Sequence, residues 1–151
     1  MNRYFFLSGI FVPLSQLNIQ HKKSFMKFPE DIKYTVDHEW VRVEDGVAFI
    51  GITDYAQDQL GEIVFVDVAT EGETIGQNEV FGSIEAVKTV SDLLMPVEAK
   101  VLEVNAALED QPELVNSDPY GKGWIIKIEI VQASDLDQLM TEVQYRKHIG
   151  E

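Results

Sequence analysis

Short runs of strand-forming residues, separated by turn signals at close spacing, are the feature that most limits how this chain can fold. Residues 40–44 and 47–52 flank Asp45-Gly46, a dipeptide that strongly favours a tight hairpin turn. Further strands are expected where apolar residues alternate or run together, at 62–68, 80–86, 90–95, 100–104 and 124–131. The run 62–68 is apolar on both faces, which predicts a buried strand. This pattern indicates a mainly β fold, a small barrel or sandwich.

The expected helices are short. One runs from Asp54, as N-cap, to a stop at Gly61. Asn105 can cap a single helical turn. A final amphipathic helix begins at Ser134 or Asp135. Its apolar residues lie on one side: Leu136, Leu139, Met140 and Val143.

The composition excludes several classes of function. The 151 residues include 26 Asp and Glu against 12 Lys and Arg, a net charge of −14, and no Cys. Without Cys, the chain has no disulfides, thiolate nucleophiles or iron–sulfur ligands, so redox chemistry would need a cofactor. The negative charge repels phosphodiester backbones and anionic lipid, so we expect neither nucleic acid nor a membrane as partner.

The first 25 residues differ from the rest. They carry Arg3, Lys22 and Lys23 and no acid, which leaves a net charge of −17 for residues 26–151. The apolar run 4–14 has no small-residue cleavage site behind it and is too short to span a bilayer. We interpret 1–25 as a leader, either a misassigned start or a disordered extension, and 26–151 as one domain in the cytoplasm. If 1–25 is a transit peptide, the location is the mitochondrial matrix.

Catalytic and metal-binding patterns are missing from the sequence. No glycine-rich phosphate loop is present, and His21, His38 and His148 do not fall at ligand spacing, so no metal is expected. His38 and Glu39 could form an acid/base pair. Adjacent strand residues point to opposite faces, however, which favours a surface histidine.

A lone lysine, Lys88, lies between the two strands at 80–86 and 90–95. A turn centred on Lys88-Thr89 would place Glu85 opposite Asp92, and like charges are unfavourable there. Centring the turn on Val87-Lys88 avoids this, with a type I or slightly wider loop because neither residue favours positive φ. A lysine at such a tip is either solubilising or an attachment point for an acyl group.

The sequence resembles the glycine cleavage system H protein family, a family of lipoyl carrier proteins, over about residues 33–131. The stretches that carry the resemblance are 38–41 (HEWV), 51–66 (GITDYAQDQLGEIVFV), 82–96, and 116–121 (NSDPYG) followed by Trp124. The resemblance implies a mainly β, lipoyl-like barrel-sandwich hybrid with short helices, and lipoic acid in amide linkage on Lys88. It implies a carrier with no catalytic residues of its own, which moves the aminomethyl group of glycine from the decarboxylating P-protein to the tetrahydrofolate-dependent T-protein. The L-protein, a dihydrolipoamide dehydrogenase, then reoxidises the arm.

Four further residues match positions with a role in that family. Glu39 and Asp92 match the cleft that receives the loaded arm and shields the aminomethyl group from water; the alternative is two surface acids. Glu85 and Gly82 match the pattern that the lipoyl- or octanoyl-attaching enzyme reads. Their alternative roles are hairpin solubility and a close approach of strands.

The chain departs from the family at Glu98-Ala99, where relatives have a small residue and Gly, and this makes the turn there less permissive. A biotinyl carrier shares the fold, but its lysine normally lies between two Met, whereas Lys88 lies between Val87 and Thr89. The linker and catalytic domain of a 2-oxoacid dehydrogenase acyltransferase are missing. A lipoyl-relay protein that donates lipoyl groups to other complexes, and an unmodified interaction domain, remain alternatives.

Overall fold

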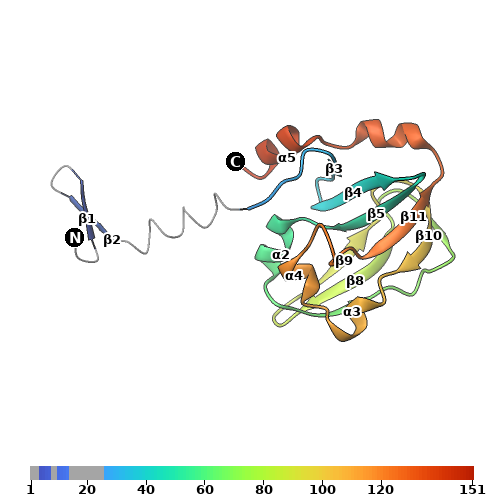
Figure 1. Ribbon diagram of the computed structural model, residues 1–151, viewed down its shortest axis with the longest axis horizontal. Coiled ribbons are helices and arrows are strands. Elements are labelled where there is room, and N and C mark those ends of the chain that lie inside the picture. The colour runs from blue at the N-terminus through green and yellow to red at the C-terminus, as the bar shows by residue number, and fades with distance from the viewer. Residues whose placement is uncertain (1–3, 8–9, 14–25) are drawn as a thin grey trace.

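A computed structural model describes residues 4–7, 10–13 and 26–151 of the chain (Figure 1). Strands β1 (Tyr4–Leu7) and β2 (Ile10–Pro13) pair with each other in antiparallel fashion. The interpretation of residues 1–25 as a leader falls mostly outside the described residues and stays a prediction.

Six strands form the larger antiparallel sheet, in the order β3-β4-β5-β11-β10-β7. Their bounds are β3 Lys33–Tyr34, β4 Glu39–Glu44, β5 Val47–Ile52, β7 Thr74–Ile75, β10 Ala99–Val104 and β11 Ile126–Ile130. Asp45 and Gly46 join β4 to β5 with φ of 51° and 83°. Two consecutive positive φ values are those of a type I′ turn, so the predicted hairpin is confirmed.

Three strands form the smaller sheet, in the order β6-β8-β9, with bounds β6 Ile63–Asp67, β8 Val80–Ala86 and β9 Val90–Leu94. The prediction that the β6 segment is buried on both faces is wrong. Ile63 is buried, but Val64 and Phe65 are 40% and 53% exposed. The reason is that β6 is an edge strand, and its pairing with β8 shifts register between Ile63 and Phe65.

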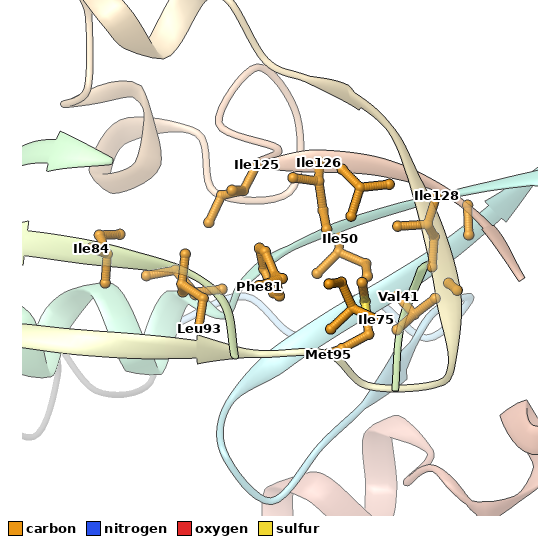
Figure 2. Packing of buried hydrophobic residues seen from close by; sticks show 14 of the residues in the cluster. Val41, Ile50, Ile75, Phe81, Ile84, Leu93, Met95, Ile125, Ile126 and Ile128 are labelled. Atoms are coloured by element: carbon orange, nitrogen blue, oxygen red, sulfur yellow. The ribbon is translucent and has the colours of Figure 1, made fainter. Parts of the chain in front are cut away.

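The two sheets share one apolar core (Figure 2). Ile50, Ile126 and Ile128 of the larger sheet meet Phe81 and Leu93 of the smaller one. Packing of this kind confirms the mainly β barrel-sandwich architecture. A second buried cluster lies beside β3 and β4 and consists of Phe28, Ile32, Tyr34, Trp40 and Tyr145.

Helix α2 (Asp54–Leu60) has the predicted span but a different cap. Its N-cap is Thr53, whose side chain accepts a hydrogen bond from the backbone N–H of Ala56, whereas Asp54 already lies inside the helix. Gly61, with φ of 83°, ends the helix as expected. Two further helices of one turn each follow β10: α3 (Ala107–Asp110) and α4 (Leu114–Ser117).

Asn105 holds the start of α3 in place, as the sequence suggests, although the residue directly before the helix is Ala106. The side-chain oxygen of Asn105 accepts from the Ala107 N–H at 3.2 Å. Its side-chain nitrogen donates to the backbone oxygens of Lys122 and Trp124. The side chain therefore ties α3 to the loop before β11 as well.

The single C-terminal amphipathic helix is corrected to two pieces, a 3-10 helix η1 (Ala133–Gln138) and an α-helix α5 (Glu142–His148). Between them, the backbone of Met140 exchanges two hydrogen bonds with that of Tyr34, at 2.8 and 2.9 Å, so this stretch is extended. Thr141 and Gln144 then start α5 with a capping box. As a result Val143 does not lie on a buried face and is 61% exposed.

Candidate functional site

Lys88 lies at the tip of the hairpin formed by β8 and β9, in the loop 87–89. The Ala86 N–H donates to the Thr89 carbonyl at 2.8 Å, and Glu85 pairs with Val90. The turn is therefore centred on Val87-Lys88, as predicted, and neither residue has positive φ. Lys88 is exposed and makes no hydrogen bond or salt bridge with another described residue. Its amine is free to react.

The loop that carries Lys88 is held at its base. The Val87 N–H donates to the Glu62 carbonyl at 3.1 Å, which links the loop to the residue before β6. Glu85 is exposed on β8, between Phe65 of β6 and Val90 of β9 in the register of the sheet. Phe65 and Val90 are themselves 53% and 63% exposed. A partner that reaches Lys88 would therefore also meet Glu85 and an apolar surface.

Gly82 has a structural reason to be glycine. A Cβ at this position would lie 2.6 Å from the Asp67 carbonyl oxygen and 2.8 Å from a methyl of Val68. Both distances are shorter than van der Waals contact, so β8 approaches the end of β6 closely at this point. The alternative role expected for Gly82, a close approach of strands, is therefore observed in the structure.

Glu39 and Asp92 line the same cleft, although they come from different sheets. The cleft has a volume of about 280 Å³. It is lined by Asp37, His38, Glu39, Ile52, Tyr55, Ala56, Gln59, Leu60, Ile84, Ser91, Asp92 and Leu93. Asp92 follows Lys88 by four residues, roughly 13 Å along an extended strand. Strand β9 thus leads directly from the lysine to the cleft.

The two acids of the cleft differ in environment. Asp92 is exposed, as a surface acid would be, but Glu39 is only 3% exposed. Burial raises the pKa of Glu39 to about 7, against the opposing effect of hydrogen bonds from the Thr35 hydroxyl (2.7 Å) and the Leu94 N–H (3.3 Å). Glu39 is therefore a carboxyl group that changes its protonation state near neutral pH.

The position of His38 differs from the surface position that the sequence predicts. The alternation rule would place it on the face opposite Glu39, yet both residues line the cleft. His38 lies just before β4 and has a φ of 73°, so strand alternation does not apply to it. It is half-buried, and its Nδ1 lies 2.8 Å from the Tyr145 hydroxyl. Burial and the nearby His148 lower the pKa of His38, which is therefore neutral at pH 7.

Metal-binding geometry is not found in the part of the chain that the structure describes, where His, Asp and Glu form no group able to hold an ion. His21 lies outside that part. Within the same described ranges, no helix is long and apolar enough to cross a membrane.

Sequence reasoning missed Tyr55 and Tyr145. Tyr55 lines the cleft from α2, and Tyr145 of α5 contacts His38, a residue of its lining. No local pattern marks Tyr145, because its partner His38 is 107 residues away.

Comparison with known proteins identifies the family. The glycine cleavage H-protein family model matches residues 32–151. This chain belongs to the glycine cleavage H-protein family. The glycine cleavage system H protein of Bacteroides fragilis is 60% identical over 121 residues, which cover 80% of this chain and 96% of that protein. The H protein of Listeria monocytogenes serotype 4a is 52% identical over 122 residues, 81% of this chain and 98% of its own length.

A solved H-protein structure shares the fold. The crystal structure of a glycine cleavage system H protein from Mycobacterium marinum matches with a TM-score of 0.75 and 37% identity. The match covers 82% of this chain and 99% of the other. The chain thus has the H-protein fold, and the role of a lipoyl carrier in glycine cleavage follows from membership of the family.

Proposed function

We propose that lipoic acid is attached to Lys88 as an amide on Nζ. The main support is the position of Lys88, an exposed and unpaired amine at a hairpin tip beside an acidic cleft, in a chain of the H-protein family. Acylation would replace a cation with a neutral amide. Since the tip lies outside the core, this change disturbs no packing.

The cleft next to Lys88 fits a chain that is apolar along its length and cationic at its end. Ile52, Leu60 and Leu93 contribute apolar walls, and Glu39 and Asp92 contribute carboxylates. When attached, lipoic acid would supply a disulfide that accepts the aminomethyl group of decarboxylated glycine on one sulfur and is left as a thiol at the other. The amine of this group is a cation. We assign the binding of this ammonium to Glu39 and Asp92, while the apolar walls exclude water and slow its hydrolysis.

Glu39 contributes more than a fixed charge to this binding. With a pKa of about 7, its carboxyl group is partly protonated at neutral pH when the cleft holds no cation. An ammonium within a few ångströms favours the ionised form. Binding would therefore release a proton from Glu39, and the affinity of the cleft for the cation would increase with pH through this range.

In this role the chain is a non-catalytic carrier in the cytoplasm. Its partners are the P-protein that decarboxylates glycine, the T-protein that uses tetrahydrofolate, and the L-protein, a dihydrolipoamide dehydrogenase. A lipoyl- or octanoyl-attaching enzyme would read the hairpin at Glu85 and Gly82, of which Glu85 is exposed beside the apolar Phe65 and Val90.

The test is the intact mass of the protein made in lipoate-supplied cells, followed by peptide mapping. We expect a single lipoyl or octanoyl amide on Lys88. Lys88→Arg should lose it and keep the fold, because a guanidinium replaces an exposed ammonium but forms no such amide. Lys100→Arg, at another exposed lysine, is the matched control, and this variant should still be modified at Lys88. An unmodified Lys88 in cells whose other lipoyl proteins are loaded would refute the assignment.

A further inference from the structure

Tyr145 is fully buried in the second cluster and connects α5 to the cleft. Its ring stacks on Tyr34, with centroids 4.6 Å apart and planes at 7°, and meets the edge of Phe28 at 5.8 Å. Its hydroxyl lies 2.8 Å from His38 Nδ1 and 2.8 Å from the Thr53 hydroxyl. Tyr145 thus places its hydroxyl, from within a largely apolar cluster, between two polar groups of other segments.

Those two groups belong to two different segments that line the cleft. His38 lines the cleft directly. Thr53 is the N-cap of α2, the helix that contributes Tyr55, Ala56, Gln59 and Leu60 to the lining. The backbone also joins the two segments, since the Thr53 N–H donates to the His38 carbonyl at 3.0 Å.

The buried hydroxyl groups set the direction of these hydrogen bonds. Thr53 is 0% exposed, and its oxygen already accepts the Ala56 N–H. If the Tyr145 hydroxyl donated to Thr53, the Thr53 proton would have no acceptor among the described contacts, and an unpaired buried proton is costly. If Thr53 donates to Tyr145 and Tyr145 donates to His38 Nδ1, every hydroxyl proton is paired. In that arrangement neutral His38 carries its proton on Nε2.

We infer that Tyr145 is a positioning residue for the cleft, whose hydroxyl accepts from Thr53, donates to His38 Nδ1 and so fixes His38 and helix α2 relative to each other. The inference deepens the proposed function and rests on it for its consequence, the protection of the bound aminomethyl group. The hydrogen-bond arrangement itself is a property of the unmodified chain.

A second contact from α5 supports this role. His148 Nε2 lies 3.1 Å from the carbonyl oxygen of Val36, the residue before Asp37 of the cleft. Helix α5 therefore holds the segment 36–38 at two points, through His148 and Tyr145. His38 needs such support because a φ of 73° is unfavourable for a residue with a side chain.

The first test uses the unmodified protein and nitrogen-15 NMR of its histidine rings. In the wild type we expect His38 as the Nε2–H tautomer, with an unprotonated Nδ1 that accepts a hydrogen bond. Tyr145→Phe keeps the ring and removes the hydroxyl, so the Nδ1 signal should shift and the amides of the first turn of α2 should exchange faster. Tyr34→Phe is the matched control, since Tyr34 is equally buried but its hydroxyl donates to the Pro29 carbonyl at 2.6 Å.

In this first test, either of two results would overturn the inference. One is a wild-type His38 that carries its proton on Nδ1, a measurement that needs no variant to fold. The other is a folded Tyr145→Phe protein whose His38 and α2 signals match those of the wild type and Tyr34→Phe.

The second test measures the consequence in lipoylated protein loaded with the aminomethyl group. Hydrolysis converts the group and one water into formaldehyde and ammonium and leaves the free thiol, so formaldehyde release gives its rate. We expect Tyr145→Phe to release formaldehyde about fivefold faster than the wild type and Tyr34→Phe, as for the loss of one hydrogen bond. An unchanged rate would overturn the positioning role. A wild-type rate equal to that of a free aminomethyl thiol would instead refute the proposed function, and the ring signals would still decide the hydrogen-bond arrangement.

Discussion

At the scale of single residues, Glu39 makes stability depend on pH. Its pKa is about 7 in the folded chain and 4.5 in the unfolded one, so between these pH values only the unfolded chain releases the proton. The free energy of unfolding should therefore fall as pH rises through this range, by at most about 3 kcal/mol. Glu39→Gln does not titrate, and its one amide oxygen can accept from either Thr35 or Leu94 but not from both. We therefore expect this variant to be less stable overall, with a free energy of unfolding that falls less between pH 5 and pH 8.

Urea unfolding at the two pH values measures this difference. His38, whose pKa is lowered, contributes stability with the opposite pH dependence, but it does so in both chains and cancels in the comparison. Asp92→Asn is the control, because Asp92 lines the same cleft but is exposed. Equal pH dependence in the wild type and Glu39→Gln would contradict the raised pKa.

Gly82 also acts at the residue scale. Gly82→Ala would place a Cβ against the backbone oxygen of Asp67, which cannot move without shifting the end of β6. We expect a loss of about 2 kcal/mol in the free energy of unfolding, measured by urea titration. Ser83→Ala, the adjacent position in β8, should cost much less. If Gly82→Ala kept full stability but lost modification of Lys88, Gly82 would act mainly in enzyme recognition.

At the scale of elements, the capping box of α5 determines how firmly that helix packs behind the cleft. The Thr141 hydroxyl accepts from the Gln144 N–H, and the Gln144 side chain accepts from the Thr141 N–H. Thr141→Ala should therefore cost about 1 kcal/mol of stability and speed hydrogen exchange in α5. Gln132→Ala is the control, since Gln132 precedes η1 without a capping hydrogen bond from its side chain. Unchanged exchange in Thr141→Ala would show that tertiary contacts alone hold α5.

At the scale of the whole molecule, residues just after Met26 contact the sheets and helices of the family region. The Lys27 N–H donates to Asp54, and Phe28 is buried in the second cluster. We expect deletion of residues 1–25 to change the melting temperature by less than about 2 °C, and deletion of 1–32, which removes Phe28 and Ile32, to lower it by more than about 8 °C. Calorimetry measures both. A drop of several degrees on removing 1–25 would mean that the leader packs on the domain.

Features that depend on neighbouring residues could be predicted from the sequence. Asp45-Gly46 specified a tight hairpin because its two residues tolerate positive φ, and apolar segments placed β8 and β9 on either side of Lys88. The position of Lys88 at a turn could therefore be predicted from the sequence. The resemblance of the sequence to the H-protein family, carried by contiguous stretches, also predicted Glu39 and Asp92 as residues of the cleft.

Properties that depend on residues distant in sequence become visible only in the folded structure. Glu39 is buried at a point where the larger sheet meets Leu94 of the smaller sheet, and Val64 and Phe65 of β6 are exposed because that strand forms an edge. Pairing of Met140 with Tyr34 split the final helix, although the local pattern favoured one continuous helix. Tyr145 reached His38 across 107 residues. Burial, register and such contacts are set by what the rest of the chain packs against each residue, and a local pattern carries no information about that.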